Sequence, residues 1–277
     1  MTLLALAELG RGVVPVDAPV LHVDDEAVLR GRAVFETLRV YGGRPFRLDA
    51  HLDRLAASAA SLHLPEPPRT AFADEAHAAI EAGGEPDAGL RFLWTPGREG
   101  ERSPRGFVLV SALPPGLDEL RARGLRLVTT PWAAGALAGA KSTSYAENMV
   151  AQEEAVRSGA DDALFVAPDG TVLEAPTANV WFRRGDTLFT PALSLRLLSG
   201  VTRGALCDLA PGLGYAVEEG RYSLEDLLGS DEVFLSSSIR EVMPVVAVDG
   251  RGIAAGPAAA ALQAGLRKLA AGYPGET

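Results

Sequence analysis

The chain has 277 residues, 47% of them apolar, which is enough for a substantial core in one large domain or in two of ordinary size. Its 26 basic and 36 acidic residues give a net charge of −10, which argues against a nucleic-acid-binding protein and favours a soluble one. The single cysteine, Cys207, excludes an intrachain disulfide, and no stretch resembles a signal peptide or a membrane span, so we expect a cytoplasmic protein.

Strands and helices alternate in the first part of the chain. They are predicted as a hairpin over 34–41 and 45–48, helices over 48–62 and 72–82, and strands over 90–95 and 107–112. The hairpin is indicated by the Gly42-Gly43 turn, and the first helix by apolar residues at helical spacing. Together these elements make a small α+β domain over residues 1–113.

Paired prolines and a glycine interrupt regular structure at Pro114-Pro115-Gly116, so we place an interdomain linker at 114–123 and a second domain at 124–277. Its predicted elements are strands over 125–130, 163–167, 171–174, 179–183 and 187–190, helices over 147–157, 202–209 and 257–271, and a helix start at Ser223-x-x-Asp226. Turn signals at Asp169-Gly170 and Gly185-Asp186 predict two successive hairpins and hence a domain rich in antiparallel sheet.

Lys141 follows a stretch rich in Gly and Ala, 133–140, that offers little bulk to obstruct a ligand. A lysine amine attacks an aldehyde only when it is neutral, which burial favours, although a lone lysine is more commonly a solvated surface residue. Glu174 ends an apolar run, where a carboxylate faces either solvent or a cation such as a protonated ring nitrogen. The pair is therefore informative only in the company of further polar motifs.

Two such motifs are suited to a phosphate. Gly200-Val201-Thr202 precedes a predicted helix, so its backbone N–H groups lie at the positive end of the helix dipole, although Thr202 is equally an ordinary N-cap. Arg54, on the first predicted helix, offers a charge-assisted contact to the same anion. An amine, an acid, a glycine-led helix start and a cluster of hydroxyls at Ser236-Ser237-Ser238 are the parts that pyridoxal 5'-phosphate requires.

Arg30 and Arg32 bracket Gly31 before the first strand of the hairpin, where they either bind a substrate carboxylate or pair with nearby acids. The 4 histidines show no metal-ligand spacing, and neither a nucleophile elbow nor a phosphate-binding P-loop is present in the sequence. We therefore expect no metal site.

In their order and spacing, these motifs resemble those of the class IV aminotransferases, the fold-type IV pyridoxal-phosphate enzymes, over residues 20–248. That group includes branched-chain aminotransferases, D-amino-acid aminotransferases and 4-amino-4-deoxychorismate lyases. The resemblance implies an α+β fold with a small N-terminal α+β domain and a larger β-barrel-like α/β domain. It also implies an active site between the domains and a homodimer in which the segment around Arg30 reaches the partner subunit's pocket.

The resemblance assigns a role to each candidate residue. Lys141 is the catalytic Schiff-base lysine, and Glu174 is the acid at the ring nitrogen of pyridoxal phosphate. The other residues that the resemblance places at the cofactor are Arg54, Leu198, Val201, Thr202, Ser237 and Ser238. Those that it places at the substrate are Arg30, Arg32, Phe35, Thr37 and Ile239.

Departures from the family pattern bear on the reaction. Thr95-Pro96-Gly97 lacks the arginine of the common Thr-Arg-Gly, so Arg30 or Arg32 is expected to replace it as the carboxylate clamp. Phe35 stands where D-amino-acid aminotransferases have a tyrosine, and Ala175-Pro176 follows Glu174 where a glycine is usual. Thr37 and the segments 141–148 and 236–242 look more like the lyases.

Our leading hypothesis is an aminotransferase that moves an amino group between an amino acid, with D-amino acids favoured, and a 2-oxo acid. The alternative is 4-amino-4-deoxychorismate lyase, which releases pyruvate and p-aminobenzoate with Thr37 assisting proton transfer. A third hypothesis, a non-catalytic binding protein, is disfavoured because Lys141, Glu174, Thr202 and Arg54 are all present.

Overall fold

A computed structural model describes residues 2–101 and 103–273, and contacts between residues divide the chain into two compact units. The first unit contains the described residues of Met1–Pro115, Ala140–Tyr145 and Ala270–Thr277. The second contains Gly116–Gly139 and Ala146–Leu269. The segment expected as a linker holds a helix, α4 (Leu117–Arg123), since only Pro114-Pro115-Gly116 is irregular. The domain boundaries at 113 and 124 stay a prediction.

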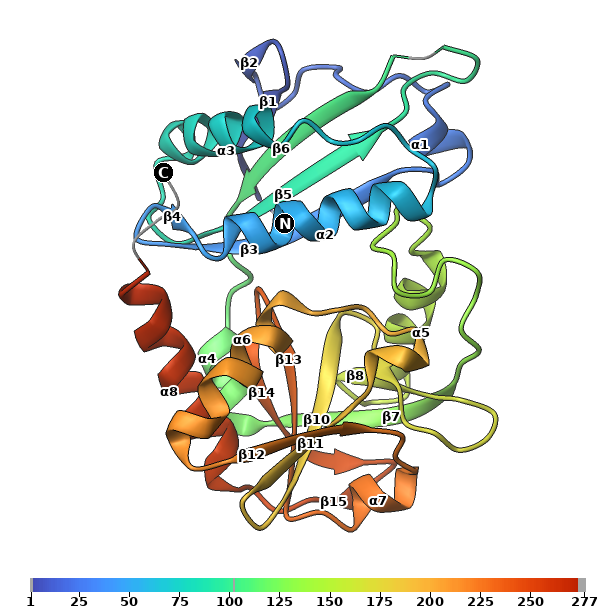
Figure 1. Cartoon of the computed structure of the whole chain (residues 1–277), viewed down its shortest axis with the longest axis vertical. Coiled ribbons are helices and arrows are strands. Elements are labelled where there is room, and N and C mark those ends of the chain that lie inside the picture. Colours follow the sequence, from blue (N-terminus) through green and yellow to red (C-terminus); the bar gives the residue numbers. More distant parts are fainter. Residues whose placement is uncertain (1, 102, 274–277) are drawn as a thin grey trace. The chain divides into compact units, whose positions relative to one another are not determined.

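The first unit is built on one sheet with the strand order β2-β1-β6-β5-β3-β4 (Figure 1). Its strands are β1 (Leu3–Glu8), β2 (Gly12–Val14), β3 (Val34–Tyr41), β4 (Arg44–Pro45), β5 (Ala88–Thr95) and β6 (Arg105–Ser111). Its helices are α1 (Glu26–Leu29), α2 (Leu48–Ser61) and α3 (Arg69–Gly83). The predicted hairpin, both longer helices and both later strands are confirmed, whereas β1 and β2 were not predicted.

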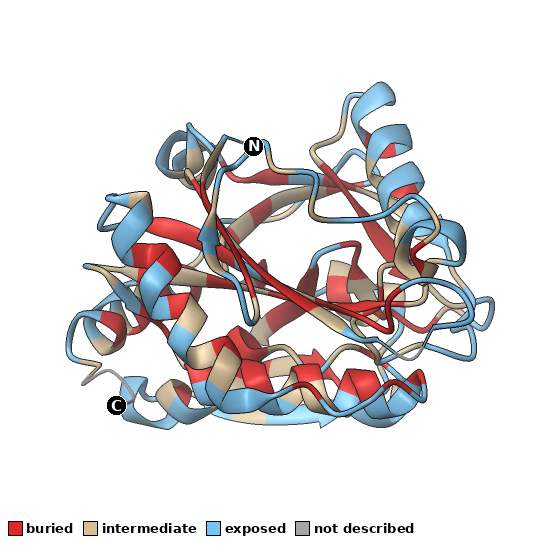
Figure 2. Ribbon diagram, turned by 90° about the horizontal axis from the view of Figure 1, so that it is seen from above, coloured by how far each residue is buried: buried red, intermediate tan, exposed pale blue. Residues whose placement is uncertain are grey.

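Alternation along β3 gives the sheet of the first unit two different faces. Val34, Leu38 and Val40 are buried with apolar residues of α2 and α3, as a strand with one face on a core requires. Phe35 and Thr37 are half-buried and point to the opposite face. In Figure 2 the helices likewise show buried residues along one side and exposed residues along the other. The half-buried face of β3 is the one that carries the expected substrate residues.

The second unit has a sheet with the order β12-β11-β10-β13-β14-β7-β8, to which β15 and β9 are attached at β14 and β10. Its strands are β7 (Leu125–Pro131), β8 (Asp162–Val166), β9 (Glu174–Ala175), β10 (Ala178–Arg184), β11 (Thr187–Pro191), β12 (Ala216–Gly220), β13 (Glu232–Ser237), β14 (Glu241–Val248) and β15 (Arg251–Gly252). Its helices are α4, α5 (Ala146–Arg157), α6 (Val201–Leu209), α7 (Leu224–Leu228) and α8 (Pro257–Ala271), and its 3-10 turns are η1 (Leu193–Leu195) and η2 (Ala210–Leu213). Helix α8 belongs to this unit up to Leu269.

The helices expected over 147–157, 202–209 and 257–271 are confirmed, as is the helix start at Ser223. Strands β10 and β11 pair as the predicted hairpin around Gly185. The hairpin expected over 163–167 and 171–174 is present around Asp169-Gly170. Val166 and Val172 form an antiparallel bridge, the N–H of Ala167 donates to the carbonyl of Thr171, and the N–H of Leu173 donates to the carbonyl of Phe165. The end of the second arm, β9, also pairs with β10, which was not expected.

The sheet of the second unit is rich in antiparallel pairs, as expected, and it also contains parallel pairs, which were not predicted. Strand β7 lies parallel to both β8 and β14, and β11 lies parallel to β12. Helix α5 connects β7 to β8, and helix α6 lies between β11 and β12 along the chain, as crossover connections between parallel strands require. Mixed helix and strand with curled sheets is the α+β architecture that the resemblance implied.

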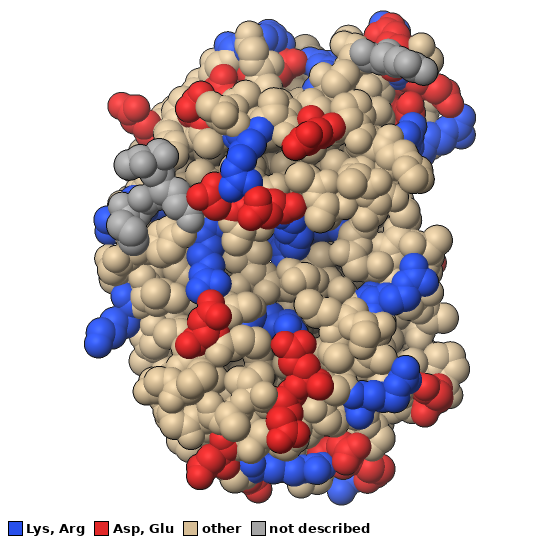
Figure 3. All heavy atoms as spheres, in the orientation of Figure 1, with Lys and Arg blue, Asp and Glu red and all other residues tan. Residues whose placement is uncertain are grey.

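Charged side chains of both signs are interspersed on the face drawn in Figure 3. Among the described residues, no helix is both long enough and apolar enough to cross a membrane.

Candidate functional site

Lys141 is fixed by its backbone to two elements of the first unit. Its N–H donates to the hydroxyl of Ser58 on α2 at 3.1 Å, and its carbonyl accepts from the N–H of Phe35 on β3 at 3.0 Å. The N–H of Thr143 donates to the carbonyl of Ala33, so the segment runs beside the start of β3. A short stretch far along the chain is thereby held as part of the first unit.

The Lys141 amine lies beside two aromatic rings. Its Nζ is 4.5 Å from the centroid of the Phe35 ring and 5.5 Å from that of Tyr145. The two rings meet edge to face with their centroids 5.4 Å apart. Aromatic faces attract an ammonium group, and their bulk restricts the flexible lysine stem to a small volume. The amine is therefore presented in a defined place on the half-buried face of β3.

Arg54 is oriented by a fully buried carboxylate. Its Nε and Nη2 donate to the two oxygens of Glu36 at 2.7 Å each, and Nδ1 of His51 also lies 2.7 Å from Glu36. Burial by itself would raise the pKa of Glu36, but the charge and hydrogen bonds of Arg54 outweigh it and lower the pKa to about 2. Burial lowers the pKa of His51 against the opposing effect of Glu36. A bidentate pair of this kind fixes the plane of the guanidinium.

Arg30 and Arg32 both face acids of their own unit. Arg30 pairs with Glu99 at 2.7 Å, and Arg32 pairs with Glu26 at 2.7 Å. Gly31 between them has φ +61°, and an added Cβ would lie 2.7 Å from the hydroxyl oxygen of Ser144. The positive φ favours glycine here, and an added Cβ would displace the Ser144 hydroxyl. Arg32 thus pairs with a nearby acid, as the alternative expected, whereas Arg30 pairs with an acid 69 positions along the chain.

Arg91, which the sequence analysis missed, lies beside the expected substrate residues. It is directly opposite Thr37 in the β3–β5 pair, and its Nε donates to the Thr37 hydroxyl at 3.3 Å. Its guanidinium carbon lies 5.3 Å from the centroid of the Phe35 ring, the same ring that Lys141 contacts. Only the register between β3 and β5 reveals this neighbourhood. A residue pattern along β5 alone contains no signal for it.

Glu174 lies on β9 in the second unit, with a partner on each side. The side-chain Nδ2 of Asn179 donates to its Oε2 at 3.3 Å, and the N–H of Leu198 donates to its Oε1 at 3.4 Å. Asn179 also donates to the carbonyl of Leu198 at 3.0 Å. The structure thus places Glu174 and Leu198 together, as the resemblance implied, and adds Asn179, which the sequence analysis did not single out.

The start of α6 has the form expected of an anion site. Gly200 is the N-cap residue, and no side chain caps the helix. Thr202 is the second helical residue and only 5% exposed, so the alternative of an ordinary N-cap threonine is wrong. The first N–H groups of a helix have no intrahelical acceptors and carry partial positive charge. Val201 and Thr202 therefore present donors suited to a phosphate.

The hydroxyl cluster lies at the end of β13, where Ser237 is the last residue and pairs with Glu241 of β14. Beyond it, Arg240 forms an ion pair with the buried Asp162 at 2.7 Å and donates to the hydroxyl of Thr177 at 2.9 Å. Ser238 and Ile239 are half-buried in this turn. The turn is thereby tied to β8 and to the segment that follows Glu174.

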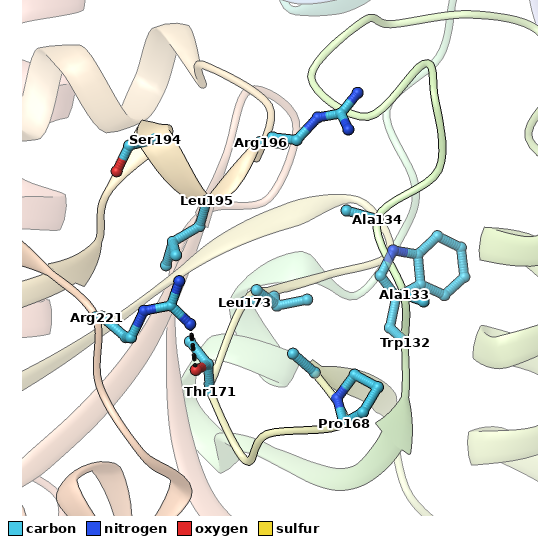
Figure 4. A pocket seen from close by; sticks show the side chains of 11 residues that line it. Trp132, Ala133, Ala134, Pro168, Thr171, Leu173, Ser194, Leu195, Arg196 and Arg221 are labelled. Carbon is cyan, nitrogen blue, oxygen red and sulfur yellow. Dashed lines mark hydrogen bonds between the residues drawn. The ribbon is translucent and has the colours of Figure 1, made fainter.

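A cavity of about 340 Å³ lies elsewhere in the second unit (Figure 4). It is lined by Trp132, Ala133, Ala134, Ala167, Pro168, Thr171, Leu173, Ser194, Leu195, Arg196 and Arg221. Arg221 is held at one side by the hydroxyl of Thr171 and by Asp169. The lining includes none of the expected site residues that the structure describes. Within the described residues no cluster of His, Cys, Asp and Glu is arranged to hold a metal ion.

Comparisons with known proteins give a consistent result. The family described as amino-transferase class IV matches residues 33–248. The bifunctional aminodeoxychorismate lyase and D-amino acid transaminase of Mycobacterium tuberculosis is 37% identical over 84% of this chain and 87% of its own length.

Two solved structures extend the likeness to the fold. A fold IV transaminase from Curtobacterium pusillum superimposes with a TM-score of 0.89 and 34% identity, over 97% of this chain and 99% of that one. A hypothetical aminotransferase from Mycobacterium tuberculosis, in a form bound to α-ketoglutarate and pyridoxamine phosphate (PMP), has a TM-score of 0.91 and 32% identity, over 96% of this chain and 98% of that one.

Proposed function

Because the chain belongs to the class IV aminotransferases, we propose that it is a pyridoxal-phosphate enzyme that moves an amino group between an amino acid, with D-amino acids favoured, and a 2-oxo acid. The observation that carries the proposal is the amine of Lys141, 4.5 Å from the Phe35 ring beside an exposed arginine, Arg91. An amine and a cation on one sheet face suit a substrate that has an amino group and a carboxylate.

The residues present fit pyridoxal phosphate. Its aldehyde requires an accessible amine, which Lys141 offers, and its ring nitrogen requires a carboxylate such as Glu174. Its phosphate requires donors and positive charge, which the start of α6 at Val201 and Thr202 and the guanidinium of Arg54 supply. We propose that these residues hold one molecule of the cofactor, with Leu198 against the ring and Ser237 and Ser238 completing the phosphate contacts.

Lys141 has two tasks in this proposal. Its Nζ would hold the cofactor in the resting enzyme, and once free it would take a proton from the substrate α-carbon and deliver it to the cofactor. When bound, pyridoxal phosphate withdraws electrons from that carbon. Glu174 holds the proton on the ring nitrogen, and the rings of Phe35 and Tyr145 restrict the lysine to the place from which it acts.

The substrate carboxylate needs a cation, for which Arg91, Arg30 and Arg32 are the candidates. Arg91 shares the Phe35 ring with the Lys141 amine, and its side chain contacts this ring and the hydroxyl of Thr37. Arg30 and Arg32, the residues expected from the sequence, are each paired with an acid. Because Arg30 and Arg32 are already engaged in ion pairs, we favour Arg91 as the carboxylate clamp. A clamp at Arg30 or Arg32 is the competing proposal. Phe35, Thr37 and Ile239 would complete the substrate contacts.

A second candidate activity is 4-amino-4-deoxychorismate lyase. Thr37 lies on the same face as Phe35, and its hydroxyl accepts a hydrogen bond from Arg91, which orients it for proton transfer. A relative that is 37% identical carries both activities in its name. In this reaction the same Lys141 amine would act while pyruvate leaves.

A direct experiment separates the candidates. The purified holoenzyme is mixed with individual D- and L-amino acids, the absorbance of the bound cofactor is followed, and 2-oxo acid is measured. Separately, pyruvate release from aminodeoxychorismate is assayed. We expect the absorbance to change with D-amino acids. Pyruvate release without any response to amino acids would instead establish the lyase, and unaltered turnover in Lys141→Ala would contradict both activities.

Two further expectations belong to this proposal. The resemblance implies a homodimer, which sedimentation of the purified protein would test, and a monomer would contradict it. A cytoplasmic location stays a prediction and is tested by cell fractionation.

A further inference from the structure

Asn179 occupies a junction between three segments of the second unit. It lies on β10 directly opposite Glu174 of β9, so both side chains share one face of the sheet. It is 6% exposed and thus separated from water. Its Nδ2 donates to Oε2 of Glu174 at 3.3 Å and to the carbonyl of Leu198 at 3.0 Å. A single amide nitrogen therefore connects the acid to the segment that precedes α6.

The other oxygen of Glu174 is held by that same segment. The N–H of Leu198 lies 3.4 Å from Oε1, so the carboxylate and Leu198 are linked both directly and through Asn179. Two donors from different directions restrict rotation of the carboxylate more than either alone. The orientation of Glu174 thus depends on the position of residue 198, which is set in turn by Asn179.

Gly200 shows how closely Asn179 approaches the start of α6. A Cβ added to Gly200 would lie 2.0 Å from Oδ1 of Asn179, far inside any permitted contact. The φ of Gly200 is −65°, which any residue adopts, so the glycine is required by space and not by backbone conformation. The amide of Asn179 is therefore packed directly on the backbone of the helix N-cap.

Few other side chains satisfy these contacts. The amide carries two N–H groups, one for each acceptor, and no charge. An aspartate would place a second carboxylate against Glu174, and an apolar residue would leave both acceptors without this donor.

We propose that Asn179 is a positioning residue. It holds the carboxylate of Glu174 in the orientation that meets the ring nitrogen. It also fixes the position of residues 198–200, and thereby the distance between Glu174 and the phosphate-binding start of α6. This inference rests on the proposed role of Glu174 in binding pyridoxal phosphate.

The test is a double-mutant cycle on cofactor affinity. Apoprotein is prepared for the wild type and for Asn179→Ala, Glu174→Gln and the double variant, and the dissociation constant for pyridoxal phosphate is measured by fluorescence quenching. Losing a buried hydrogen bond worth about 1 to 1.5 kcal/mol predicts roughly tenfold weaker binding in Asn179→Ala. In the Glu174→Gln background, the same substitution should weaken binding less than about twofold.

Thr190→Val is a matched control, since it removes a buried hydrogen bond from the Thr190 hydroxyl to the carbonyl of Val180 on the same strand as Asn179. It should change cofactor affinity by less than about twofold. Thermal melting of each apoprotein shows whether a loss of affinity merely follows a loss of folding.

Gly200→Ala is a second route to the same answer if Asn179→Ala does not fold. The added methyl displaces the Asn179 amide, so Gly200→Ala should weaken cofactor binding in the wild-type background. In the Asn179→Ser background, where the side chain is smaller, Gly200→Ala should not weaken cofactor binding further. The proposal would be overturned if Asn179→Ala weakened cofactor binding equally in the wild-type and Glu174→Gln backgrounds. It would also be overturned if neither Asn179→Ala nor Gly200→Ala weakened cofactor binding. Wild-type affinity in Glu174→Gln would instead overturn the role of Glu174 and, with it, this inference.

Discussion

The amine of Lys141 lies 4.5 Å from the centroid of the Phe35 ring, although 106 positions separate the two residues along the chain (141 − 35). The contact exists because the segment 140–145 runs beside β3, where the N–H of Phe35 donates to the carbonyl of Lys141. The backbone hydrogen bond fixes the register, and the register brings the amine over the ring. The position of the reactive amine is therefore set by strand pairing.

Phe35 is expected to restrict the Lys141 amine by its aromatic face. Phe35→Leu removes the ring and with it an interaction of about 0.5 to 2 kcal/mol, so we predict a fall in kcat of roughly 2- to 30-fold. Phe35→Tyr keeps the ring and should stay within about twofold of the wild type. Steady-state kinetics of both variants provide the measurement. Equal kcat values for Phe35→Leu and the wild type would show that the ring does not act on the amine.

Arg91 is expected to bind the substrate carboxylate. A charge-assisted hydrogen bond is worth about 1.5 to 3 kcal/mol, so Arg91→Gln should raise KM for the amino acid by roughly 10- to 150-fold while leaving cofactor affinity unchanged. The comparison is the double variant of Arg30→Gln and Arg32→Gln, which we expect to keep KM within about threefold. The reverse result would place the clamp at Arg30 or Arg32.

Glu36 makes stability sensitive to acid. Its pKa is lowered from 4.5 to about 2, so its contribution is complete above pH 4.5 and is lost as the pH falls through 2. The lowered pKa of the buried His51 acts in the same direction, because the native state disfavours its protonation. Between about pH 5 and pH 2, the free energy of unfolding should fall less in Glu36→Gln than in the wild type, and the difference should be on the order of 3 kcal/mol. Urea denaturation at a series of pH values measures this.

The control for that experiment is Glu99→Gln, which removes a carboxylate that is 49% exposed in an ion pair with Arg30. Exposed pairs contribute little, so its pH dependence should match that of the wild type. If Glu36→Gln and Glu99→Gln have the same pH dependence, the buried pair is not the source of acid sensitivity.

Ser223 caps α7 through a reciprocal pair of hydrogen bonds. Its hydroxyl accepts from the N–H of Asp226 at 3.1 Å, and the Asp226 carboxylate accepts from the N–H of Ser223 at 3.0 Å. Ser223→Ala should lower the free energy of unfolding by about 1 kcal/mol and the melting temperature by roughly 2 to 4 °C. Ser223→Thr retains the hydroxyl and should melt near the wild-type temperature. Equal melting of all three proteins would show that the cap does not limit stability.

Local patterns predicted much of the fold. Periodicity and end signals gave the helix over 257–271 and the cap at Ser223, because both depend on residues within a few positions of one another. The hairpin expected at 163–174 is present for the same reason, since its turn at Asp169-Gly170 lies between the two arms. The local pattern did not predict what pairs with its outer side, where the N–H of Val172 donates to the carbonyl of Tyr222, 50 positions along the chain (222 − 172).

By itself, the sequence determined the family, the cofactor chemistry and the residues Lys141, Glu174, Thr202 and Arg54 as candidates, because their order along the chain carries that information. Tertiary structure alone decided which neighbours those residues have. The β3–β5 register placed Arg91 beside Thr37, ion pairs with Glu99 and Glu26 took up Arg30 and Arg32, and the β9–β10 pair set Asn179 against Glu174. The contacts of Arg91 and Arg30 join residues 54 and 69 positions apart, and all of these contacts depend on strand pairing or side-chain packing that a residue pattern along one segment does not encode.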